Sequence, residues 1–404
     1  MNHVISKHDK NILRETTCNL NDGSSVIAKL IWLRNNSPKL YEGAEFLLLG
    51  AHDYINWMLC GSRVTDYTNA STTGLFDIKN NSWALSLLEK LNIRTDWLPE
   101  LKSGYQITGH LKKAIAHELG LEEGLPIFHG VGDAASATIG SSAGEPGHFY
   151  IYLGTSWWLA TSGFNEIVDP HTGIWNLRHV NPDRMMYLGP MLTTAGNWEW
   201  VIETFGDLEV KNKLSEISTY AILEKVAAES PAGSNGVVYL PMIRGERAPV
   251  RDPNARGVFF GIQTTTTRAD LYRSVLEGVA YAMLSIRDIM QENLPDNIND
   301  FELVLTGGGA KSNLWAQIFS DVMNCTVKVL SSPEDVGVKG MAIVAGKTFG
   351  WHKNLIPEGS FLQFEQTFEP SLDSPIYRRC YQIYKRLYPS LKSMFTYSAN
   401  ILAK

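Results

Sequence analysis

The chain has 404 residues, of which 44% are hydrophobic and 19% are charged, a composition typical of globular proteins and enough for two domains. The formal net charge is −6 and no block of Lys or Arg stands out, which disfavours nucleic acid as a partner. No apolar run is long enough to cross a bilayer, and the polar start lacks the apolar core of a secretory signal. The four cysteines form no C-x-x-C pair, which argues against a disulfide framework or a cysteine zinc site. Together these features favour a cytoplasmic protein without a membrane segment.

The first third of the chain predicts helices separated by a loop. The run FLLLGAHDYINWMLCG (46–61) indicates a helix that ends at Gly61, and SWALSLLEKL (82–91) has the apolar spacing of an amphipathic helix. The Thr-, Ser- and Gly-rich stretch between them, VTDYTNASTTGLFD (64–77), is interpreted as a loop.

The remainder predicts alternating strands and helices. LPIFHGVGD (125–133) is a strand that runs into glycines and an acid, and FYIYLGTSWWLAT (149–161) is typical of a hairpin. A long helix is expected after the capping box of Thr267 and Asp270. FELVLTGGGAKSNLWAQIFSDVM (301–323) indicates a strand, a glycine turn and a helix. This order predicts an α/β fold with a mixed sheet, divided into domains at 1–142 and 143–404.

Asp133 is the first candidate for chemistry. It follows Gly130 and Gly132 at the end of a predicted strand, where ligands of α/β proteins bind. A carboxylate there could take a proton from an attacking hydroxyl group. The alternative, that Asp133 only caps the following helix, has similar standing and can coexist with the first.

Two glycine turns are candidates for binding phosphate or ribose. Gly154, Thr155 and Ser156 join the hairpin strands and could offer backbone N–H and hydroxyl groups to phosphate oxygens, although a plain turn explains them as well. Gly307, Gly308 and Gly309 precede a helix that opens at Ser312 or Asn313. They permit close approach by a ligand or, equally, close packing of the helix on the strand. The turn at Gly307 to Gly309 is neither a Walker A loop, because Lys311 follows Ala310 and not Gly, nor a dinucleotide fingerprint.

Other polar groups are interpreted as structural. The loop at Gly245-Glu246-Arg247 carries charges that can hold it rigid without a catalytic part. The histidines, His52 and His129 among them, have no spacing typical of a metal site.

In sequence order the chain resembles the FGGY family of carbohydrate kinases over almost its whole length. AKLIWLRNN (28–36) looks like the family's first signature, although Val26 departs from the usual small residue or Pro, and GVFFGIQTTTTRADLYRSVLE (257–277) matches the second at every constrained position. Between and around them lie GVGD, YLGTS, GERAP and TGGGAKSNLW in the family's order.

The resemblance implies an actin-like ATPase (ribonuclease H-like) fold of two domains closing over ATP and a sugar. It implies that Asp133 is the general base, that Gly154, Thr155 and Ser156 hold ATP phosphates, and that Gly307 to Gly309, Asn313 and Gly196 line the nucleotide pocket. Mg²⁺ is expected with ATP. Among the family's branches the xylulokinases are most similar, so a ketopentose or related polyol is the expected substrate.

Family members begin with a hairpin carrying an Asp and a Gly-Thr turn, and no such hairpin precedes residue 28. The first domain is therefore expected to be incomplete, with an unpaired sheet edge that a homodimer would be one way to cover. Two hypotheses follow: an active sugar kinase, or a truncated remnant that binds nucleotide without catalysis. A dinucleotide-dependent oxidoreductase ranks last.

Overall fold

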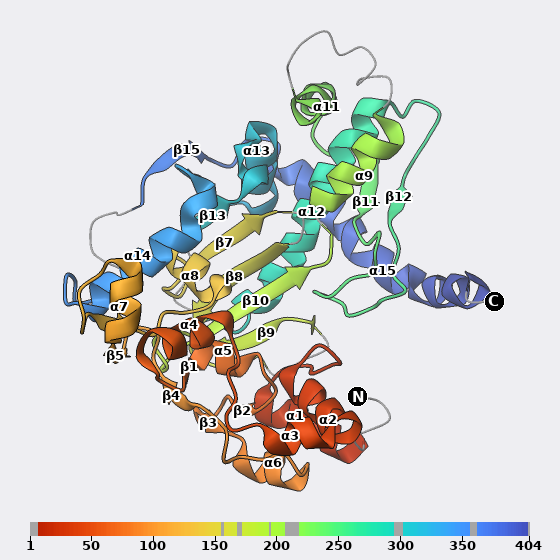
Figure 1. Cartoon of the computed structure of the whole chain (residues 1–404). Helices are drawn as coiled ribbons and strands as arrows, with labels where there is room; N and C mark the ends of the chain where they lie inside the picture. Colours follow the sequence, from red (N-terminus) through yellow and green to blue (C-terminus); the bar gives the residue numbers. More distant parts are fainter. Residues whose placement is uncertain are drawn as a thin grey trace.

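The computed structural model describes residues 7–154, 157–167, 172–193, 195–206, 218–294, 302–355 and 362–402. At its centre lies a seven-stranded mixed sheet in the order β15-β14-β13-β7-β8-β10-β9 (Figure 1). Its strands are β7 (His148–Leu153), β8 (Trp157–Gly163), β9 (Trp175–Arg178), β10 (Met185–Met191), β13 (Glu302–Thr306), β14 (Val327–Leu330) and β15 (Phe364–Phe368). β13 runs parallel to β7 and to β14, and the other pairs are antiparallel. The predicted mixed sheet is confirmed.

The predicted hairpin is present as β7 and β8. The two strands pair antiparallel, with Leu153 opposite Trp157. Because side chains alternate along a strand, β7 divides its apolar residues between the two faces of the sheet. Phe149 and Ile151 join one hydrophobic cluster, and Tyr150 joins another.

Helices cover both faces. On the Tyr150 face lie α8 (Asp133–Gly140) and α14 (Val336–Thr348). They pack backbone to backbone, because a Cβ atom on Gly140 would lie 1.9 Å from the Val336 carbonyl oxygen. The opposite face carries α9 (Ala195–Phe205), α11 (Thr219–Ala228), α12 (Arg268–Gln291), α13 (Asn313–Met323) and α15 (Ser374–Leu402).

Several boundaries follow from local chemistry that the sequence displays. α12 begins with the predicted capping box, in which the Thr267 hydroxyl accepts from the Asp270 N–H. α13 is capped by Ser312, whose hydroxyl accepts from the Trp315 N–H at 3.1 Å. Between the large elements lie η2 (Ser234–Gly236), η3 (Gly308–Lys311), η4 (Pro333–Asp335) and the paired strands β11 (Val238–Leu240) and β12 (Val258–Phe260).

The first part of the chain, drawn in red and orange in Figure 1, is mainly helical and has a hydrophobic cluster of its own, from Leu13 to Trp97. Its helices are α1 (Lys7–Thr17), α2 (Val26–Asn36), α3 (Pro38–Gly43), α4 (Ala51–Cys60), α5 (Tyr67–Ser71), α6 (Leu85–Lys90) and α7 (Lys113–Leu119). Its described strands are β1 (Val64–Asp66), β2 (Phe76–Asp77), β3 (Ser82–Trp83), β4 (Glu100–Lys102), β5 (Ile107–His110) and β6 (Pro126–Phe128). They form three two-stranded sheets, β1–β4, β2–β3 and β5–β6.

The predicted loop at 64–77 is wrong. This segment forms β1, α5 and β2. The Asp66 carboxylate accepts hydrogen bonds from the Thr68 and Asn69 N–H groups and so starts α5. Asp, Ser and Thr are common in loops but also cap helices, and in this segment Asp66 acts as a helix cap.

The division at 142/143 stays a prediction. α8, which it assigns to the first domain, packs on α14 and on the sheet of the second. Among the described helices, none combines the length and apolar character needed to cross a bilayer.

Candidate active site

A cavity of about 500 Å³ opens where the parallel strands β7 and β13 end. This is the position at which α/β proteins commonly bind ligands, because loops and helix N-termini converge there. Its lining residues come from the end of β7, α9, α11 and its N-cap, α12, η3 and the start of α13: Leu153, Gly154, Ala195, Trp198, Glu199, Ser218, Tyr220, Ala221, Glu224, Leu276, Gly308, Gly309, Lys311, Ser312 and Trp315.

The predicted glycines of the turn after β13 have different surroundings. Gly307 has φ +80° and ψ 179°, which only glycine adopts readily. A Cβ atom there would lie 2.8 Å from the Leu153 carbonyl oxygen. A Cβ atom on Gly308, in contrast, would meet no other atom within 4 Å, and Gly308 lines the cavity. Close packing therefore explains Gly307, whereas Gly308 leaves room for a ligand.

Acidic and aromatic side chains complete the cavity. Glu224 accepts hydrogen bonds from the Ser312 hydroxyl at 2.8 Å and the Leu314 N–H at 3.2 Å, and so ties α11 to the start of α13. Partial burial and the nearby Glu199 raise the pKa of Tyr220. A wall of aromatic rings beside carboxylate acceptors suits a flat heterocycle with attached hydroxyl groups.

The other predicted nucleotide-binding residues lie at the rim or outside the described residues. Gly154 lines the cavity. Gly196 and Asn313 each follow a lining residue, Ala195 and Ser312, in the first turns of α9 and α13. Thr155 and Ser156 lie outside the described residues.

Asp133 is the first residue of α8 and is exposed. It is not the N-cap, which is Gly132; its carboxylate accepts from the Ala134 N–H at 2.7 Å. A helix N-terminus stabilises a carboxylate by its dipole and free N–H groups. The Tyr150 hydroxyl donates to the Ala134 carbonyl at 3.4 Å. The start of α8 thus rests on β7, the strand whose end lines the cavity, although Asp133 itself is not among the lining residues.

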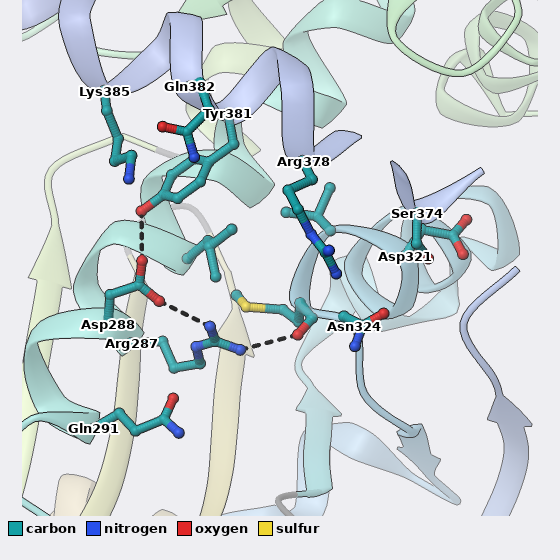
Figure 2. Close-up of a pocket in the computed structure, with 13 residues that line it drawn as sticks. Arg287, Asp288, Gln291, Asp321, Asn324, Ser374, Arg378, Tyr381, Gln382 and Lys385 are labelled. Atoms are coloured by element: carbon teal, nitrogen blue, oxygen red, sulfur yellow. Dashed lines mark hydrogen bonds and ion pairs between the residues drawn. The ribbon is translucent and has the colours of Figure 1, made fainter. Parts of the chain in front are cut away.

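A second cavity, of about 420 Å³, lies between α12, α13 and α15 (Figure 2). Figure 2 shows that polar groups there bind one another. The Tyr381 hydroxyl donates to Asp288 at 2.9 Å, and Arg287 donates to Asp288 at 2.8 Å and to the Met323 carbonyl at 2.9 Å. Among the described residues, none of those predicted for the active site lines it.

The fold and the cavity place the chain in the class of α/β proteins with an actin-like ATPase fold. A model of the FGGY family of carbohydrate kinases matches residues 1–140 with its N-terminal domain and residues 149–349 with its C-terminal domain. The chain therefore belongs to the FGGY family of carbohydrate kinases, and the predicted family and fold are confirmed.

Comparisons with individual proteins agree with this family assignment. The chain is 28% identical over 366 residues to a xylulose kinase from Staphylococcus xylosus, covering 90% of this chain and 73% of the relative. It is 28% identical over 353 residues to an autoinducer-2 kinase from Yersinia enterocolitica, covering 86% and 66%. The structure of a ligand-bound xylulose kinase from Lactobacillus acidophilus superposes with a TM-score of 0.86 at 25% identity, covering 96% of this chain and 76% of that one.

Sequence reasoning missed most of the cavity's side chains. Glu199, Tyr220 and Glu224 lie on α9 and α11, where Gly196 is the only residue predicted from the sequence. The packing of α9 and α11 on α12, and the hydrogen bonds of Glu224 to the start of α13, bring them to the glycine turn. No local signal could have identified them.

Proposed function

We propose that this carbohydrate kinase transfers the γ-phosphoryl group of ATP to a hydroxyl group of a ketopentose or related polyol. The observation that carries the proposal is the cavity at the ends of β7 and β13, with Gly154 and the open Gly308 at its wall. The names of the relatives support a ketopentose, since several are xylulose kinases.

In this proposal the cavity holds the adenosine. Aromatic walls at Trp198 and Trp315 pack against the base, and Glu199 or Glu224 accepts from ribose hydroxyls. The residues Gly307 to Gly309, Asn313 and Gly196 border the nucleoside. The phosphates extend toward Gly154, and Thr155 and Ser156 stay the predicted phosphate contacts, outside the described residues. Mg²⁺ prefers phosphate oxygens, waters and one or two carboxylates, and would neutralise the charge of the phosphates.

Asp133 acts as the general base. Its exposed carboxylate takes the proton of the attacking sugar hydroxyl, whose oxygen bonds to the γ-phosphorus while the bond to the β–γ bridging oxygen breaks and ADP leaves. The start of α8 holds this carboxylate in position, because Asp133 accepts a hydrogen bond from the Ala134 N–H at 2.7 Å. The same proposal places the protein in the cytoplasm, where ATP is available.

The test is ADP release with D-xylulose and a panel of ketoses and polyols, in the presence of ATP and Mg²⁺. Sugar-dependent release that is lost in Asp133→Asn supports the proposal. Release that is independent of sugar, or unchanged in Asp133→Asn, contradicts it. Light scattering of the same sample tests for a homodimer.

A second candidate is nucleotide binding without transfer. It is favoured by one observation: the described residues that line the cavity all lie between Leu153 and Trp315, so this pocket wall uses none of residues 7–142. Calorimetry separates the two, because ATP binding without release for any sugar would leave this second function.

A further inference from the structure

A cluster of four ionisable side chains lies apart from the nucleotide cavity, in the first part of the chain. His52 and Asp53 belong to α4, Asp66 ends β1, and His129 follows β6. Asp53, Asp66 and His129 are buried, and the His52 side chain is 22% exposed. Potential ligand atoms of His52, Asp66 and His129 all lie within 4.8 Å of one another. No spacing in the sequence indicates this cluster, because only folding brings together His52 and His129, which are 77 positions apart.

Each carboxylate uses one oxygen for the backbone and turns the other toward the imidazoles. Asp53 Oδ2 accepts from the Leu49 N–H at 3.0 Å and the Gly50 N–H at 3.1 Å. Asp66 Oδ1 accepts from two N–H groups at the start of α5. These bonds fix both carboxyl groups in place. The other two oxygens, Asp53 Oδ1 and Asp66 Oδ2, face the imidazole rings of His52 and His129.

The contacts among these atoms leave an excess of acceptors. Asp66 Oδ2 lies 2.8 Å from His52 Nε2. Asp53 Oδ1 lies 3.4 Å from the same nitrogen and 3.2 Å from His129 Nε2, yet it is buried and has no hydrogen-bond partner among the described residues. His129 Nδ1 lies 2.9 Å from the Gly130 carbonyl oxygen, so a neutral ring that donates there has only a lone pair to present to Asp53.

If both imidazoles were neutral, the two buried carboxylates would carry an uncompensated charge of about −2, which is costly away from water. One divalent cation or two protons would neutralise it. The geometry is compatible with the cation. A tetrahedral Zn²⁺ with bonds of about 2.0–2.1 Å has ligands about 3.3 Å apart. Three of the separations in the cluster are 2.8, 3.2 and 3.4 Å, and His129 comes within 3.9 Å of Asp66 Oδ2, so the side chains would have to draw closer around the ion.

We propose that His52, Asp53, Asp66 and His129 form a binding site for a divalent transition-metal ion of the Zn²⁺ class. His129 Nδ1, held by the Gly130 carbonyl, has the partner that a ligating histidine usually has on its second nitrogen. The partly exposed His52 provides the route of entry. The ion would link α4, the β1–α5 junction and the turn after β6, four residues before Asp133. Its role is structural, and it does not depend on the proposed kinase reaction.

The experiment uses the full chain without a polyhistidine tag, stripped of metal by a chelator and titrated with Zn²⁺ by calorimetry. We expect one ion per chain, and with Co²⁺ the intense visible absorption of a tetrahedral complex. His52→Gln, at the rim of the cluster, should lower the affinity by more than about 100-fold, since loss of a second-shell partner alone costs about 10- to 100-fold. His117→Gln, which replaces an exposed histidine of α7, is the matched control and should bind as the unmodified chain does.

No binding, or binding that survives unchanged in both His52→Gln and His129→Gln, overturns the proposal; in the first case two protons neutralise the cluster. If the variants do not fold, X-ray absorption at the zinc edge of the unmodified chain decides. Two imidazole ligands support the site, and none or one overturns it.

Discussion

The nucleotide cavity and the His–Asp cluster of the first part are built in opposite ways. The cavity depends on backbone geometry at the ends of adjacent strands, where Gly307 packs on Leu153 and Gly308 stays open. The cluster depends on side chains from three separated segments, in which backbone N–H groups hold both carboxylates. Sites of the first kind are predictable from short motifs, and sites of the second kind emerge only when the chain folds. The following predictions test that contrast.

The largest effect is expected for Asp133→Asn. The amide cannot accept the proton of the attacking hydroxyl, and general-base catalysis contributes about 10²- to 10⁴-fold. We expect ADP release with sugar to fall by that range while ATP affinity, measured by calorimetry, changes little. Asp183→Asn, at an exposed aspartate, is the control. An equal loss in both variants would mean that the effect is not specific to the base.

A smaller loss is expected when Gly50 is changed to Ala. The added Cβ atom would lie 2.7 Å from His52 Cε1 and 2.9 Å from Asn69 Nδ2, so the His52 ring must shift from the position that it holds in the cluster. Zn²⁺ affinity should fall by about 10- to 100-fold, with ATP binding unchanged. Gly43→Ala, where a Cβ atom meets nothing within 4 Å, should change neither. Unaltered Zn²⁺ affinity in Gly50→Ala would show that the position of His52 is unimportant.

Gly307→Ala and Gly308→Ala form a matched pair. The first places a side chain at a positive φ and against the Leu153 carbonyl, and should lower the free energy of unfolding by about 1–3 kcal/mol. The second meets open space, so its stability should stay within about 0.5 kcal/mol while ATP affinity falls. Urea denaturation and calorimetry measure both. If the two variants behave alike, the proposal that Gly307 serves packing and Gly308 leaves room for the ligand is wrong.

The last prediction is a pH dependence of stability that arises from Glu246, an effect that is small over any single pH unit. Burial raises its pKa from 4.5 to about 8, even though the Leu192 and Arg247 N–H groups donate to it. Between these two pKa values the folded chain keeps a proton that the unfolded chain has lost. The contribution of the protonated Glu246 to the free energy of unfolding is therefore fully present below pH 4.5 and is lost as pH rises through 8. The slope is at most about 1.4 kcal/mol per pH unit.

Denaturation curves at about pH 5 to 8 should show a smaller slope in Glu246→Gln, which imitates the protonated carboxyl group, than in the unmodified chain. A part of the slope should remain, because burial also raises the pKa of Glu277, to about 7. Glu229→Gln, at an exposed glutamate, should keep the full slope. A slope in Glu246→Gln that equals the slope of the unmodified chain would assign the pH dependence to other groups.

Much of the fold was predictable because its signals are local. The capping box of Thr267 and Asp270, the helix ending at Gly61 with its left-handed φ of 84°, and the β7–β8 hairpin all depend on neighbouring residues. The segment 64–77 was misread for a related reason: Asp66 is as suited to a loop as to a helix cap, and its neighbours do not decide between them.

The sequence by itself determined the family, the alternation of strands and helices, and the positions of Asp133 and the glycine turns, because each is written in a contiguous motif. Only the tertiary structure decided which glycine packs and which stays open, that Glu224 reaches Ser312, and that His52 meets Asp66 and His129. These relations join residues far apart in the chain. They depend on how helices pack on the sheet and on one another, which no local pattern specifies.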